Sequence, residues 1–211
     1  MRWNRFFEDL EHELDSGLEV QQASVDGEAE RLRVSRLELR TRFLALSGSG
    51  VLLELAGGSL LIGRLVAGGA DWIGLIREPG GAALVPLRSI HAIRIGREAM
   101  LASVGAGVGA SADAGAGRDS AKPARTSLSE RQTFGYVLRD LARRRIAVVL
   151  QQNDERALAG TIDRVGADHL DLALHDRGAP RREAEVSGYR IVPLAAVAWV
   201  KLDESSAMFA A

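Results

Sequence analysis

Apolar and polar residues alternate over several short stretches of the chain. In the clearest stretch, 169–175, leucine stands at positions 170, 172 and 174 and other residues stand between them. A period of two places successive side chains on opposite faces of a β-strand. We therefore expect these leucines to point into a core and the residues between them to face outward.

The strand pattern occurs twice. The block that starts at Gly63 aligns without a gap with the block that starts at Gly160, and Val85–Ile93 aligns with Val192–Val200. The offsets are 97 and 107, so the second copy has ten additional residues, which we place in a longer hairpin loop over 176–189. Each copy is predicted to contain about five short strands, and a sheet this small is expected to curl into a barrel.

Apolar residues at helical spacing precede each copy. Leu39, Phe43 and Leu46 predict a short helix before the first. Before the second, Ser127–Glu130 matches a capping box and is followed by an apolar series at Phe134, Leu138, Leu141 and Ala142. A third, amphipathic helix is predicted over 4–18. Residues 19–36 either belong to one long helix through Arg42 or break near Gly27.

These patterns predict a mainly β protein with helices (α+β), built as two tandem small barrels that each follow a helix. The expected parts are an N-terminal helical segment, 1–38; a first barrel, 39–102; a flexible linker, 103–126; a helix and second barrel, 127–203; and a tail, 204–211. The linker is predicted from its Gly, Ala, Ser and Asp, which bury too little surface to offset the entropy cost of ordering.

Each copy resembles the Sm-like and SH3-like small-barrel superfamily. The resemblance rests on a Gly in the second strand, Asp71 or Asp168 in the turn before the third strand, and an ending of the type Val-Pro-Leu-x-x-Ile-x-x-Ile. The layout also resembles an actinobacterial family of tandem barrels that has no assigned activity. In RNA-binding Sm-like proteins an Asn contacts a base at the third strand, and the aligned positions here hold Gly74 and Asp171. The resemblance therefore does not carry over that base contact.

The composition of the chain excludes several classes of function. With 46% hydrophobic and 26% charged residues, the 211-residue chain has a globular composition, and its lack of cysteine excludes disulfides and thiolate chemistry. The net charge of -1 argues against binding to nucleic acid by bulk charge alone. We see neither a secretory signal nor an apolar run long enough to span a membrane, so we expect a cytoplasmic protein without a membrane partner.

Catalytic and metal-binding patterns are scarce. His169, Asp171 and His175 share one strand face, but the two histidines are about 20 Å apart along an extended strand, too far to bind one metal. A surface hydrogen bond between His169 and Asp171 is the simpler expectation. We find no GxSxG or HExxH motif. The sequence predicts no enzyme, no cofactor, no metal site and no small-molecule substrate.

Charge and apolar seams suggest two kinds of binding surface. Segments 31–42 and 118–145 are basic, while residues 1–30 hold nine acidic residues against two arginines, so these segments are expected to neutralise one another. If the basic helices instead form a phosphate-binding patch, its candidate residues are Arg36, Arg40, Arg139, Arg143, Arg144 and Arg145. The apolar seam of the first helix is the candidate protein-binding surface, with Trp3, Phe7, Leu10 and Leu14.

The leading hypothesis is a non-catalytic cytoplasmic interaction module that binds a protein partner or associates with itself. Small barrels expose strand edges, and exposed edges must be covered or paired. The alternative is a nucleic-acid-binding regulator, for RNA or DNA, that uses the arginine-rich helices.

Overall fold

The computed structural model describes residues 25–78, 80–105, 131–176 and 182–202. The chain divides into two compact units, 1–38 and 39–211. In the first unit, residues 25–35 form a helix that includes Gly27, and a turn follows it. The predicted helix over 4–18 and its seam Trp3, Phe7, Leu10 and Leu14 lie outside the described residues.

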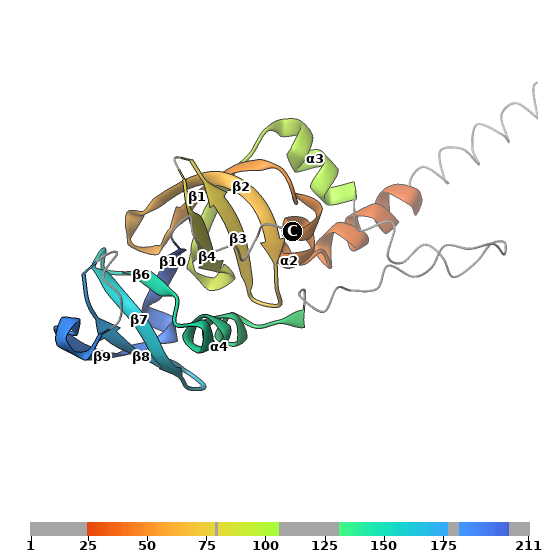
Figure 1. Ribbon diagram of the computed structural model, residues 1–211. Helices are drawn as coiled ribbons and strands as arrows, with labels where there is room; N and C mark the ends of the chain where they lie inside the picture. Colours follow the sequence, from red (N-terminus) through yellow and green to blue (C-terminus); the bar gives the residue numbers. More distant parts are fainter. Residues whose placement is uncertain (1–24, 79, 106–130, 177–181, 203–211) are drawn as a thin grey trace, which may run out of the picture. The chain divides into compact units, whose positions relative to one another are not determined.

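The second unit contains one antiparallel sheet of ten strands (Figure 1). The first five strands are β1 (Gly50–Leu55), β2 (Leu60–Gly68), β3 (Trp72–Arg77), β4 (Ala82–Pro86) and β5 (Ile90–Arg94). The other five are β6 (Ala147–Gln152), β7 (Ala157–Val165), β8 (His169–Leu174), β9 (Gly188–Pro193) and β10 (Val197–Leu202). Their order across the sheet is β5-β1-β2-β3-β4-β10-β6-β7-β8-β9.

Short helices connect and flank the strands. The two predicted helices before the copies are confirmed as α2 (Leu39–Ala45) and α4 (Phe134–Arg144). Thr133 caps α4, because its side chain accepts a hydrogen bond from the Tyr136 amide. The predicted capping box, Ser127–Glu130, lies outside the described residues. Helix α3 (Arg97–Gly105) was not predicted and includes the first residues assigned to the linker; the rest of 103–126 lies outside the described residues. Single 3-10 turns are η1 (Ala56–Gly58), η2 (Leu87–Ser89), η5 (Glu183–Glu185) and η6 (Leu194–Ala196).

The prediction of two tandem barrels is wrong. In each half the fifth strand lies beside the first, but β4 does not turn to meet β5. Instead β4 pairs with β10 of the second half, so its backbone N–H and C=O groups find partners there and both halves join one open sheet.

The repeat itself is visible in the strand registers. Val51 pairs with Gly63 in the first half, and Val148 pairs with Gly160 in the second, at the predicted offset of 97. The amide of Leu87 donates to Asp71 O at 2.8 Å, and the amide of Leu194 donates to Asp168 O at 2.7 Å. The two donors are separated by the offset of 107, and the two acceptors by the offset of 97. Residues of the two halves can therefore be compared position by position.

The core forms two clusters, and each of them is in contact with residues of both halves. The cluster around α4 includes Trp72 and Leu84 of the first half, and Trp199 of β10 packs against the cluster around Phe43. The alternation predicted for 169–175 also fails at its end, since Ala173 and His175 are buried. The burial of the His175 imidazole is compensated by a hydrogen bond, since its Nε2 lies 2.8 Å from the buried Thr161 hydroxyl.

Candidate interaction edge and charged hollow

The junction between the halves shows how a strand docks on this sheet. Three residues of β4 face three residues of β10, in the pairs Leu84↔Val200, Ala83↔Lys201 and Ala82↔Leu202. Nearby, the Asp71 carboxylate accepts a hydrogen bond from the Phe134 amide at 2.6 Å. The Ser89 hydroxyl lies 2.6 Å from Ala198 O. Strand pairing and side-chain contacts thus act together at this interface.

In the second half, strand β9 is the equivalent of β4. Unlike β4, which pairs with β10, β9 is an edge strand of the sheet. By the offset of 107, Ile191 corresponds to Leu84 and Tyr189 to Ala82. Ile191 is 74% exposed and Tyr189 60%, whereas Leu84 is fully buried against β10. Exposed apolar side chains on an edge strand are unusual, because such edges attract further strands.

The backbone of β9 presents hydrogen-bonding groups to the open side. The amide of Leu194 faces β8, where it reaches Asp168 O. Because successive residues of an antiparallel strand face opposite neighbours, Val192 and Arg190 also face β8, and the N–H and C=O of Tyr189 and Ile191 face outward. The structure gives β9 no strand neighbour on that side among the described residues.

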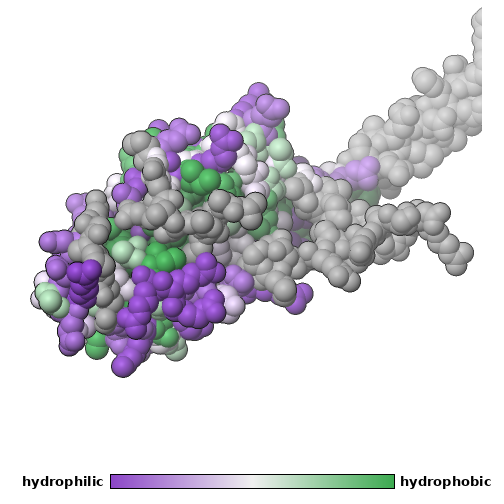
Figure 2. Space-filling view, viewed as in Figure 1, coloured by the Kyte–Doolittle hydropathy of each residue, from purple (hydrophilic) through white to green (hydrophobic). Residues whose placement is uncertain are grey.

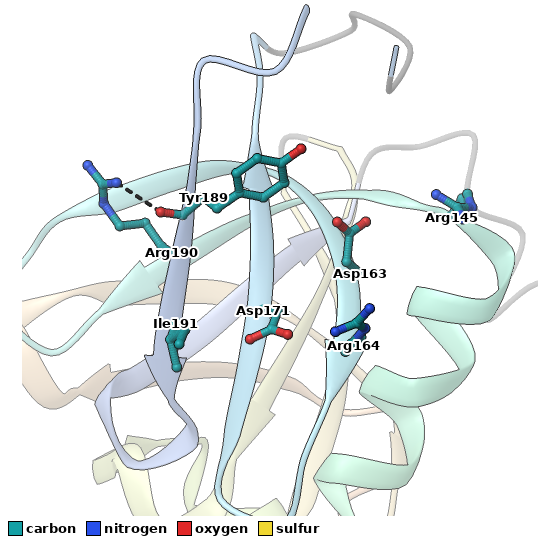
Figure 3. Close-up of a pocket in the computed structure, with 7 residues that line it drawn as sticks. All are labelled: Arg145, Asp163, Arg164, Asp171, Tyr189, Arg190 and Ile191. Atoms are coloured by element: carbon teal, nitrogen blue, oxygen red, sulfur yellow. Dashed lines mark hydrogen bonds between the residues drawn. The ribbon is translucent and has the colours of Figure 1, made fainter. Parts of the chain in front are cut away.

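A hollow of about 670 Å³ lies beside this edge (Figure 3). It extends from β9 across β8 and β7 to the end of α4. Its lining consists of Arg145, Asp163, Arg164, Asp171, Tyr189, Arg190 and Ile191. Arg164, Asp171 and Ile191 form one row across the three strands. Figure 2 shows that hydrophilic residues dominate the visible face of this half.

The arginines of the hollow have open bonding capacity. Within the described part of the chain, no carboxylate forms a salt bridge with Arg145, Arg164 or Arg190. Arg190 donates to the backbone O of its neighbour Tyr189, at 3.0 Å, and its side chain is directed away from Asp171 (Figure 3). The edge therefore offers guanidinium donors as well as apolar side chains.

The corresponding positions in the first half are small or apolar. Asp171 and Arg164 replace Gly74 and Ala67, and Tyr189, Arg190 and Ile191 replace Ala82, Ala83 and Leu84. Ala82, Ala83 and Leu84 are buried in the junction. The second half has thus exchanged a buried docking face for an exposed, charged one.

The candidate arginines from the sequence are distributed over several places. Arg36 is exposed in the first unit, and Arg40 donates to Gly69 O at 2.9 Å. Arg143 and Arg144 both pair with Asp140, at 2.5 and 2.8 Å, and Arg139 is exposed on α4. Of the predicted set, Arg145 alone lines the hollow.

The predicted hydrogen bond between His169 and Asp171 is wrong, because His169 bonds to a different aspartate. His169 Nδ1 lies 2.8 Å from Asp168 Oδ1 rather than bonding to Asp171. This hydrogen bond, and secondly the charge of His169, lowers the pKa of the Asp168 carboxyl below its ordinary value. Among the described residues no group of three or more metal-ligating side chains comes together.

Tyr189, Arg190, Ile191 and Arg164 were missed as site residues. Residues 176–189 were predicted to form a loop, whereas the edge strand β9 already begins at Gly188. The signal was nevertheless present, because Tyr189–Ile191 directly precedes the aligned block at Val192 and stands where the first copy has Ala82–Leu84.

No family model matches the chain, and comparisons with curated proteins and with solved structures also found no match. The resemblance to the Sm-like and SH3-like superfamily remains a prediction. Within the described ranges, no helix has the length and apolar character needed to cross a membrane.

Proposed function

We propose that the protein is a non-catalytic, cytoplasmic interaction module that accepts a strand of a protein partner at β9. The observation that carries this proposal is the contrast between two equivalent strands. β4 is paired and its side chains are buried, whereas β9 has outward-facing backbone groups beside the exposed Tyr189 and Ile191. Strand addition uses main-chain hydrogen bonds for affinity and alternate side chains for specificity.

Photo-cross-linking from a residue of the edge strand β9 tests this function. We expect p-benzoylphenylalanine at Tyr189 in the full chain to form a defined protein adduct in cells. The matched control places the same group at Tyr136, which is 52% exposed but lies on α4. Equal adducts from both positions, or none from Tyr189, would contradict the proposal.

A proline substitution separates strand addition from simple surface contact. Ile191→Pro removes an N–H that faces the open side, so the β8–β9 ladder keeps its hydrogen bonds. We expect this variant to lose the Tyr189 adduct, while Ile191→Ala, which keeps the N–H, retains a weakened one. Thermal unfolding of both variants checks that the fold persists.

Nucleic acid binding is the second candidate, favoured by the grouping of Arg145, Arg164 and Arg190 beside Tyr189. Asp163 and Asp171 in the same hollow oppose it, since carboxylates repel phosphate. Phosphate contacts make affinity fall steeply with salt. Binding of RNA or DNA with a steep salt dependence that Arg145→Ala and Arg164→Ala reduce would favour this candidate.

A further inference from the structure

We infer that Arg190 selects the strand that β9 accepts: it favours an acidic residue flanked by two apolar residues, and it rejects β5 of a second copy of this chain. The inference rests on the proposed strand-accepting function and identifies its partner chemistry.

The junction supplies the register. There, Val200, Lys201 and Leu202 of β10 stand opposite Leu84, Ala83 and Ala82 of β4. The offset of 107 transfers these three positions of β4 to Ile191, Arg190 and Tyr189 of β9. A strand that docks on β9 as β10 docks on β4 therefore places its middle residue opposite Arg190.

The three positions on β9 set the preferred pattern. Ile191 and Tyr189 are exposed apolar residues on one face, so apolar residues opposite them bury surface. Arg190 lies between them on the other face and has no carboxylate partner among the residues that the structure describes. Opposite charges across a strand pair attract and like charges repel, so an acidic middle residue is favoured.

The strand β5 of a second copy fits this pattern except in charge. It corresponds to β10, and Ile93 and Arg94, together with Ile95 just after the strand, take the places of Val200, Lys201 and Leu202. Arg94 would then face Arg190, whereas Lys201 faces the uncharged Ala83. The partner of Arg94 is Glu54 of its own sheet, at 3.0 Å.

The charged hollow adds to this rejection. Arg164 and Asp171 stand where the first half has Ala67 and Gly74, and Ala67 packs against the cluster that the junction buries. Docking a second copy in the junction geometry would take these two charges out of water, which is costly unless they are paired. Head-to-tail growth of the sheet is therefore opposed at two places.

Two peptides test the inference on the full-length protein. The first has the sequence of residues 90–96, Ile-His-Ala-Ile-Arg-Ile-Gly, with blocked ends, and the second carries Glu in place of its Arg. Titration followed by the amide signals of β9 should show that the Glu peptide binds about fivefold more tightly or better. Arg190→Glu should reverse the preference, and Arg190→Lys should keep it. Arg139→Glu, an equal charge change on α4, should leave it unchanged.

The outcomes distinguish the two proposals. Equal binding of both peptides, or tighter binding of the Arg peptide, would overturn the selection by Arg190 and leave strand acceptance intact. If neither peptide binds up to millimolar concentration and Ile191→Pro changes no adduct, strand acceptance itself is wrong. In sedimentation, the Arg190→Glu chain should associate more strongly than the native chain. Native chains that already join through β5 and β9 would contradict the inference.

Discussion

Gly63 and Gly160 show at the scale of single residues why each copy needs a glycine in its second strand. A Cβ at Gly160 would overlap Ala173 O, and one at Gly63 would overlap Ile76 O. The close approach is between backbones, so no flexible side chain can move aside. The repeated glycine is thus a packing requirement of two adjacent strands.

We expect Gly160→Ala to destabilise the protein by about 1–3 kcal/mol or more, because the added methyl group must displace the neighbouring strand. Urea unfolding measures this loss. Gly50→Ala is the control, since a Cβ at Gly50 has no atom within 4 Å. Equal stability of both variants would contradict the packing argument.

Asp168 gives a prediction about pH. Its pKa is lowered from 3.8 by the hydrogen bond from His169. A lowered pKa in the folded state means that the carboxylate's contribution to stability is present above the unfolded pKa. That contribution is lost as the pH falls through the folded value, below about pH 4. An NMR titration should place Asp168 below 3.8, and His169→Ala should return it toward 3.8. An unchanged titration in that variant would show that the pair does not form.

At the scale of elements, the same turn has different tasks in the two halves. Asp71 accepts a hydrogen bond from the first amide of α4, while its counterpart Asp168 has a 90% exposed side chain. Trp72, next to Asp71, donates to Gln132 O at 3.0 Å. The first turn therefore anchors a helix of the other half, whereas the second turn leaves its aspartate exposed.

Asp71→Ala should cost about 1 kcal/mol, because the buried end of α4 loses a charged acceptor. Asp71→Asn keeps an oxygen at that position and should cost less. The matched substitution Asp168→Ala should leave the stability at neutral pH nearly unchanged, as is usual for exposed positions. Chemical unfolding of the three variants compares them directly, and equal losses at both aspartates would refute the anchoring role.

At the scale of the whole molecule, we expect the described part of 39–202 to unfold as one cooperative structure, because its halves share a sheet and each core cluster contacts both halves. Trp72 reports on the cluster around α4, and Trp199 reports on the cluster around Phe43. Tandem barrels with separate cores would unfold independently, but here each cluster loses packing contacts when the other half unfolds.

Two single-tryptophan chains, Trp3→Phe with Trp199→Phe and Trp3→Phe with Trp72→Phe, measure this coupling. Each is expected to unfold in urea in one transition, and the probe in each should follow the far-UV circular dichroism of the same chain. In either variant, a fluorescence midpoint clearly separated from the circular dichroism midpoint would show that the halves unfold independently.

Local patterns in the sequence were sufficient for the repeat, its ten strands, and the helices α2 and α4. Alternation, helical spacing and the aligned Gly and Asp positions act over a few residues, so they can be recognised without knowledge of distant contacts. The aligned blocks at Gly63 and Gly160 also identified equivalent positions in the two halves, whose strand registers the structure then supplied.

Only the tertiary structure decided how the two halves pair, and that β9, the equivalent of β4, becomes an edge strand. The backbone groups of β4 are identical whether they pair with β5 to close a barrel or with β10 to extend a sheet, so no local pattern distinguishes these outcomes. The choice of β10 buries Ala82 and Leu84 and leaves Tyr189 and Ile191 exposed. The candidate site arises from that long-range pairing, which is why residues far apart in the sequence, from Arg145 to Ile191, come to line one hollow.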